Sequence, residues 1–89
     1  MQKKRRKLNK DFEKKIYSSK KNVELVLAKI YDIDDEDIQT EYISSFNKVV
    51  SLFDALKEDY DQKGFHDNSE GILKNYNNAF NLFESEFEI

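Results

Sequence analysis

The apolar residues of the chain recur at steps of three and four in three separate stretches, which is the spacing of an amphipathic helix. The clearest stretch predicts a helix over about residues 35–60, in which the apolar positions step by 4, 3, 4, 3 and 4. Such a heptad seam packs against one or two other helices. The seam is formed by Tyr42, Phe46, Val49, Phe53, Leu56 and Tyr60.

Two further helices are predicted, one on each side of the seam helix. The first covers about residues 9–31, with Asn9 as its N-cap, and its polar stretch at residues 18–22 leaves room for a kink or an exposed segment. The other covers about residues 70–87, with Ser69 as its N-cap. The apolar faces of the two helices are Phe12, Ile16, Val23, Val26, Leu27 and Ile30, and Ile72, Leu73, Tyr76, Ala79, Phe80, Phe83 and Phe87.

The connections between the three helices are short. An acidic segment follows the first helix, where Asp34 or Asp35 can cap the second, and residues 61–68 form a loop before the third. The 89 residues include no proline and only two glycines, which favours long helices. The sequence therefore predicts an all-α fold: residues 9–89 form a small up-down three-helix bundle, preceded by a basic arm at residues 1–8. Dimerisation to a larger bundle stays open.

Charge is distributed unevenly along the chain. Residues 1–22 carry ten Lys and Arg against two acids, a net +8, whereas residues 23–89 carry five lysines against sixteen acids, a net −11. The whole chain is at −3. Such segregation indicates two candidate binding surfaces, one for a basic partner protein and one for a polyanion such as RNA or DNA. They are Asp34, Asp35, Glu36 and Asp37, and Lys3, Lys4, Arg5, Arg6 and Lys7, respectively. The alternative for the basic arm is a solvated tail that only aids solubility.

The sequence contains few of the residues and motifs on which catalysis usually depends. Cysteine is absent and His66 is the single histidine, so most pairings of a nucleophile with a base are excluded. A glycine-rich phosphate loop and a zinc-binding HExxH pattern are also absent. We therefore predict a protein that is not an enzyme and has no cofactor.

One segment resembles the calcium loop of an EF-hand. Residues 59–70 place Asp59, Asp61 and Glu70 at the first, third and twelfth positions, with Gly64 at the sixth. Lys63, however, stands where a third oxygen ligand belongs. The simpler interpretation is an acidic connection between two helices, and a calcium-responsive module is the third functional hypothesis.

Several large apolar residues fall outside the predicted helix faces. They belong either to a broad core or to an exposed patch that binds another protein or a second copy of the chain. They are Tyr17, Leu25, Tyr31, Leu82 and Ile89.

These features favour a small non-enzymatic protein that acts by protein–protein interaction, as an inhibitor, immunity or adaptor protein. Bacteriocin immunity proteins, small antitoxins and phage-encoded inhibitors share its size and helical plan, although no residue motif ties the sequence to them. The bias toward Asn, Lys, Ile and Tyr is typical of AT-rich bacteria and phages. The alternative is an accessory component of a nucleoprotein assembly that contacts RNA or DNA through the arm. Without a signal peptide or a membrane-spanning stretch, we expect a cytoplasmic protein with no membrane role.

Overall fold

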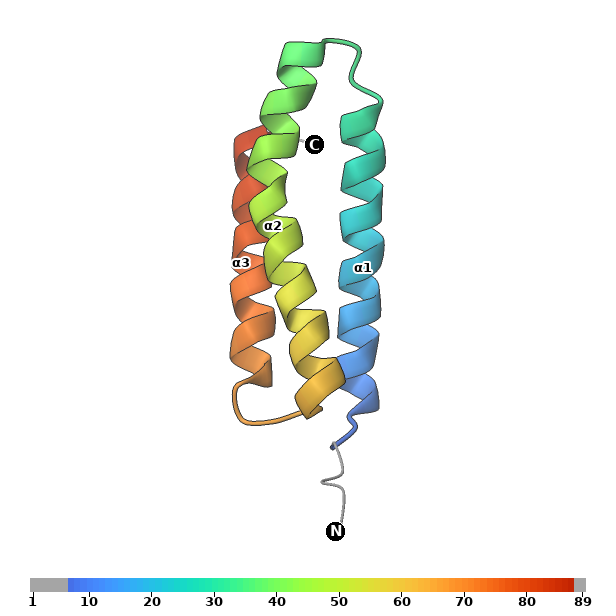
Figure 1. The fold of residues 1–89 in the computed structure, drawn as a ribbon, viewed down its shortest axis with the longest axis vertical. Helices are drawn as coiled ribbons and strands as arrows, with labels where there is room; N and C mark the ends of the chain where they lie inside the picture. The colour runs from blue at the N-terminus through green and yellow to red at the C-terminus, as the bar shows by residue number, and fades with distance from the viewer. Residues whose placement is uncertain (1–6, 88–89) are drawn as a thin grey trace.

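The computed structural model describes residues 7–87, and within this range the chain forms three helices and no β-sheet. They are α1 (Lys10–Tyr31), α2 (Glu36–Lys63) and α3 (Ser69–Phe87). The helices run up, down and up along a rod whose extents are 56 × 22 × 17 Å (Figure 1). The prediction of an all-α three-helix bundle is confirmed.

Helix α1 begins where the sequence predicts. The Asn9 side chain accepts a hydrogen bond from the backbone N–H of Phe12 at 2.9 Å, which satisfies one of the donors that the first turn leaves free. The helix then continues without interruption through residues 18–22. Ser19 in this polar stretch is only 6% exposed, so part of the stretch faces the core.

Helix α2 is the longest element and is defined by a cap at each end. Asp35 Oδ1 accepts from the backbone N–H groups of Asp37 at 2.9 Å and Ile38 at 3.1 Å. At the other end Gly64 has φ 71° and ψ −159°, a backbone conformation that is essentially restricted to glycine. The helix therefore ends three residues later than the predicted position near Tyr60.

The start of α3 differs from the prediction. Ser69 is the first helical residue rather than the N-cap, and its hydroxyl accepts from the backbone N–H of His66 at 2.9 Å. His66 Nδ1 in turn accepts from the backbone N–H of Asn68 at 3.2 Å. Together these bonds close the turn at residues 66–69 that leads into α3. Ser69 is thus one residue inside the helix, and its hydroxyl bonds to the preceding turn instead of to the first turn of α3.

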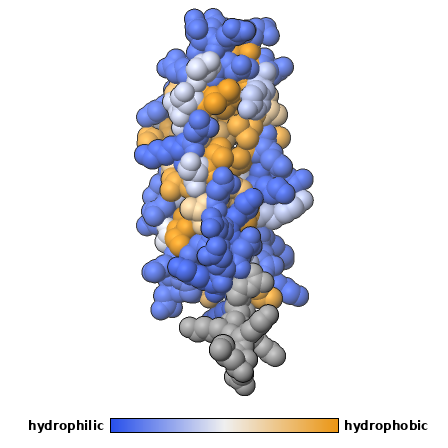
Figure 2. All heavy atoms as spheres, viewed as in Figure 1, coloured by the Kyte–Doolittle hydropathy of each residue, from blue (hydrophilic) through white to orange (hydrophobic). Residues whose placement is uncertain are grey.

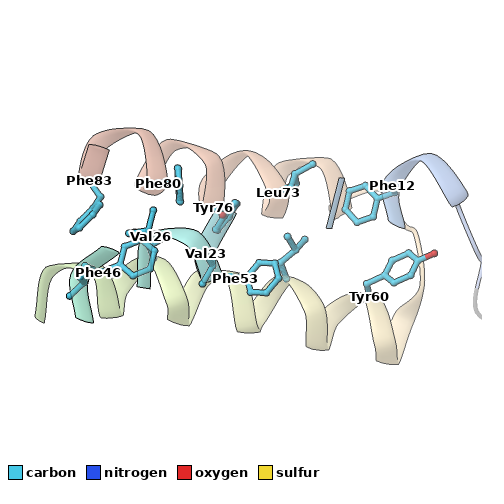
Figure 3. Packing of buried hydrophobic residues seen from close by; sticks show 13 residues of the cluster. Phe12, Val23, Val26, Phe46, Phe53, Tyr60, Leu73, Tyr76, Phe80 and Phe83 are labelled. Carbon is cyan, nitrogen blue, oxygen red and sulfur yellow. The ribbon is translucent and has the colours of Figure 1, made fainter. Parts of the chain in front are cut away.

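The core lies along the length of α2, which packs against both α1 and α3. Figure 3 shows Phe80 and Phe83 of α3 pointing toward α2, where the Phe46 ring lies 6.2 Å and 4.8 Å from theirs. The seam is confirmed, since all of its residues except the half-buried Tyr42 are buried. The buried apolar residues are Phe12, Val23, Val26, Ile30, Phe46, Val49, Phe53, Leu56, Tyr60, Leu73, Tyr76, Phe80 and Phe83.

Helices α1 and α3 meet through a large and a small residue. The Tyr76 side chain is 1% exposed, and its hydroxyl donates to the backbone carbonyl of Ser19 at 3.3 Å. The small Ser19 side chain leaves space for the ring beside α1. Burial raises the pKa of Tyr76 to about 12, because the charged phenolate would lose its hydration. Tyr76 is therefore a neutral core residue with one satisfied polar atom.

Candidate partner-binding surfaces

The acidic segment between α1 and α2 forms one tip of the rod, and all four predicted partner-binding acids are exposed there. Asp35 is the one of the four whose carboxylate caps α2. Asp34, Glu36 and Asp37 lie around it, and Glu36 and Asp37 occupy the first turn of α2, where negative charge complements the helix dipole. The structure thus brings the four predicted acids together in one exposed cluster.

The connection that carries this cluster is anchored from α2. Gln39 Nε2 lies 3.3 Å from the carbonyl oxygen of Ile30, 3.2 Å from that of Tyr31 and 3.4 Å from that of Ile33. The side-chain amide of Gln39 thereby offers a hydrogen-bond donor to carbonyl groups at the end of α1 that have no partner within the helix. Sequence reasoning missed this residue. The sequence nevertheless indicates this role. Gln39 lies three residues before Tyr42 and so continues the seam, where a polar residue faces the neighbouring helix.

The end of α3 adds charge to the same end of the molecule. We define the acidic end as residues 29–41 and 81–87, which carry eight acids and one lysine, a net −7. Among the described residues, no lysine or arginine lies within ion-pairing distance of any of these carboxylates. The acidic end therefore presents uncompensated negative charge.

Asp35 and Asp34 offer a matched test of which carboxylate is structural. We expect Asp35→Ala to lower the free energy of unfolding by about 1 kcal/mol, because two backbone N–H groups lose their acceptor. Asp34→Ala removes the same charge from the adjacent position and should change stability by less than about 0.5 kcal/mol. Urea titrations followed by circular dichroism measure both values. Equal losses would show that charge, and not the cap, determines stability there.

One of the predicted polyanion-binding residues, Lys7, lies at the opposite end of the rod. Lys3, Lys4, Arg5 and Arg6 are outside the described residues, so only Lys7 can be placed. Its backbone carbonyl accepts from the N–H of Phe65 at 2.7 Å, and its ammonium lies 6.0 Å from the Phe65 ring centroid. Lys7, grouped with the arm in the sequence, is therefore attached to the loop between α2 and α3.

A hydrogen-bonded group around Tyr60 joins the start of α1 to the end of α2. The Tyr60 hydroxyl accepts from the backbone N–H of Asn9 at 3.0 Å and lies 2.5 Å from Glu13 Oε2, to which it donates. The Tyr60 ring packs against Phe12, with centroids 5.6 Å apart. Periodicity predicted Tyr60 as a core residue, but it carries no signal for these polar contacts between elements distant in sequence.

The body of the protein is not basic where the arm joins it. We define the basal end as residues 7–15 and 57–70. Its first segment carries four lysines against two acids, and its second two lysines against five acids, a net −1. Acids from α2 and α3 therefore offset the α1 lysines, as in the 3.7 Å ion pair of Lys15 with Glu70. Within the described residues, this end therefore carries no excess of positive charge.

The EF-hand-like segment has a different geometry from a calcium loop. Asp59 and Asp61 lie within α2, and Glu70 lies in the first turn of α3. The Asp59 carboxylate already has two partners. One oxygen lies 2.6 Å from Nε2 of His66, and the other lies 3.7 Å from Nζ of Lys63. Within residues 7–87, no group of three or more His, Asp or Glu side chains is placed to hold a metal ion. The three predicted ligands are not brought together.

Four of the five off-face apolar residues are exposed, and Ile89 lies outside the described residues. Leu25, Tyr31, Tyr17 and Leu82 are 61%, 65%, 60% and 58% exposed, so they contribute little to the core. Tyr17 also lines a groove of about 400 Å³ between α1 and α2. The core therefore does not include all of the large apolar side chains of the sequence, and several of them remain on the surface.

Comparison of the chain with protein-family models, with curated proteins and with solved structures finds no match. Of the helices in residues 7–87, none combines the length and the apolar character needed to cross a membrane. The class defined by the structure is thus a small helical bundle with a concentrated acidic end.

Proposed function

We propose that this protein is a non-enzymatic binding protein whose acidic end docks onto a basic surface of a partner protein. The observation that carries the proposal is the net −7 of residues 29–41 and 81–87, whose carboxylates form no ion pair with the described lysines. Exposed like charges that are not neutralised internally raise the local potential and steer an oppositely charged partner toward the surface. An inhibitor, immunity or adaptor protein of a bacterium or phage, acting in the cytoplasm, fits this description.

Two further features support a docking role. The Asp35 cap and the contacts of Gln39 hold the acidic connection in one conformation, so little order has to be gained on binding. Apolar side chains lie close to the charge, since Tyr31 and Ile38 are 65% and 44% exposed at the same end. An interface with a central aromatic contact and a charged rim is the usual arrangement in protein complexes.

The test lowers the charge of the acidic end from −7 to −4 without removing its cap. The full-length chain captures its partner from an extract of the source organism, and the purified pair is then compared with the variant Asp34→Asn/Glu36→Gln/Asp37→Asn. We expect the dissociation constant to rise about tenfold, mainly through slower association, and the difference to shrink in high salt. The matched control is Asp54→Asn/Glu58→Gln/Asp67→Asn, which removes three exposed acids elsewhere and should bind like the original chain.

The same experiment separates the proposal from the nucleoprotein alternative. Deleting residues 1–6 removes four basic side chains but keeps Lys7 and its hydrogen bond to Phe65. Under the proposal this deletion leaves partner binding intact. Loss of binding on deletion, together with unchanged binding of the acidic-end variant, would instead support contact with RNA or DNA through the arm.

A further inference from the structure

His66, the single histidine of the chain, connects α2 to the turn that leads into α3. Its Nε2 lies 2.6 Å from an oxygen of the Asp59 carboxylate, and its Nδ1 lies 3.2 Å from the backbone nitrogen of Asn68. Its backbone N–H donates to the Ser69 hydroxyl at 2.9 Å, and its carbonyl accepts from the Ser69 N–H at 3.0 Å. Both ring nitrogens and both backbone polar groups of His66 are therefore hydrogen-bonded.

These contacts determine which ring nitrogen of His66 carries the proton. The backbone N–H of Asn68 can only donate, so Nδ1 has to offer a lone pair and carries no hydrogen. The ionised carboxylate of Asp59 can only accept, so Nε2 carries the hydrogen and donates it. The geometry therefore requires a neutral imidazole with its hydrogen on Nε2.

We propose that His66 is a pH-sensitive switch in the turn at residues 66–69. Protonation of the ring places a second hydrogen on Nδ1, which then faces the N–H of Asn68, so that two donors meet without an acceptor. The contact between Nε2 and Asp59 persists, and it gains strength because the imidazolium is positively charged. The ring therefore stays bound to α2, while Asn68 loses its hydrogen bond and the turn before α3 rearranges.

The ring is accessible to a proton from the solvent. The side chains of His66 and Asp59 are 27% and 15% exposed, so part of the pair reaches the surface. On the face drawn in Figure 2, hydrophilic residues cover most of the basal end. Histidine is the residue type that ordinarily changes charge between pH 5 and 8, a range in which carboxylates and lysines largely keep theirs. A change of pH in this range therefore acts mainly on this side chain.

Charged groups from all three helices and from the segment before α1 lie at this end of the rod. Apart from Asp59 they are Lys7, Lys15, Lys63, Asp67 and Glu70. Lys15 and Glu70 form an ion pair with each other at 3.7 Å, and Lys63 lies 3.7 Å from the second oxygen of the Asp59 carboxylate. Among the described residues, Asp59 is the charged group in hydrogen-bond contact with the ring. It therefore has the largest electrostatic influence on the protonation of His66.

The switch lies next to the point at which the N-terminal segment is attached. Phe65, the residue before His66, donates its backbone N–H to the carbonyl of Lys7 at 2.7 Å. A rearrangement of the turn therefore occurs one residue away from the bond that holds Lys7. This inference does not depend on the partner protein proposed above, since it concerns the basal end and not the acidic end.

A pH titration of the full-length chain by nuclear magnetic resonance tests the inference. At pH 8 we expect the hydrogen of the His66 ring on Nε2 and none on Nδ1, which long-range proton–nitrogen spectra of the imidazole distinguish. As the pH falls to 5, Nδ1 gains a proton, and the amide proton resonance of Asn68 should move to lower frequency with the same midpoint. The Ser69 amide, which donates to the His66 carbonyl, should move less. A hydrogen on Nδ1 at pH 8, or an Asn68 amide that does not follow the ring, would overturn the inference.

Two variants identify the group that acts on Asn68 and the partner of the ring. His66→Gln has no ring to protonate, so its Asn68 amide resonance should stay constant between pH 8 and 5. Asp59→Asn retains an oxygen that accepts from Nε2 but removes the negative charge, so the midpoint of the ring titration should fall by about half a pH unit. The matched control Asp67→Asn removes the carboxylate next to His66 in the sequence and should shift the midpoint by clearly less. Equal shifts for Asp59→Asn and Asp67→Asn would contradict the proposed switch.

Discussion

Replacing Phe46 with alanine is expected to lower the free energy of unfolding by about 3–5 kcal/mol. The ring is 0% exposed and packs against Phe80 and Phe83, so truncation removes buried apolar surface and leaves a cavity among side chains of α2 and α3. A domain of this length has a total stability of roughly 4–13 kcal/mol, so the variant stands near the limit of folding. Urea denaturation followed by circular dichroism measures the change.

Two companion variants separate the cavity from a general effect of substitution. Phe46→Leu keeps most of the volume and should cost clearly less than Phe46→Ala. Tyr31→Ala removes a ring of similar size that is 65% exposed, and its effect should stay within about 0.5 kcal/mol. If Phe46→Ala and Tyr31→Ala destabilised the protein equally, the packing of α2 against α3 would not be the main source of stability.

A second large effect is expected in alkaline solution. The pKa of Tyr76 is about 12 in the folded protein, against an ordinary value of 10.0, so the unfolded chain releases the phenolic proton first. The stabilisation that follows from the neutral, buried phenol is complete below pH 10 and is lost as the pH rises toward 12. Because one pKa unit corresponds to 1.36 kcal/mol, the loss amounts to about 2–3 kcal/mol.

Tyr76→Phe isolates this contribution from other effects of alkaline solution on the chain. At neutral pH the variant lacks the hydrogen bond to Ser19 and should be about 1 kcal/mol less stable. It has no proton to lose, so its stability should exceed that of the original chain near pH 12. Tyr17→Phe, at an exposed site, is the control and should follow the original chain. Parallel pH profiles for Tyr76→Phe and the original chain would refute the assignment.

Periodicity predicted the secondary structure and the core closely, for a clear physical reason. Apolar residues at steps of three and four have to be buried together, and in a chain without proline a short connection returns each helix against its predecessor. The seam from Phe46 to Tyr60 could therefore be predicted from residue spacing alone. The end of α2 and the first residue of α3 were missed by one to three residues, because they depend on the loop conformation at Gly64 and on hydrogen bonds around His66.

The candidate surfaces could be predicted only in part. The acidic cluster at Asp34–Asp37 was readable as a run of like charges, and its exposure agrees with that interpretation. The contribution of Glu84 and Glu86 to the same end follows from the direction of α3. Conversely, the +8 of residues 1–22 suggested a basic region, yet acids of α2 and α3 offset the lysines of α1 in the described part of the chain.

The sequence by itself thus determined which residues form helices, which faces are buried and that the charges are segregated, since these properties depend on local spacing and composition. Only the tertiary structure decided which charges share an end, that Ser19 accommodates Tyr76, that Gln39 holds the end of α1, and that Tyr17 and Tyr31 stay exposed. These outcomes depend on contacts between residues far apart in the chain, for which the packing of three helices sets the distances and local spacing carries no information.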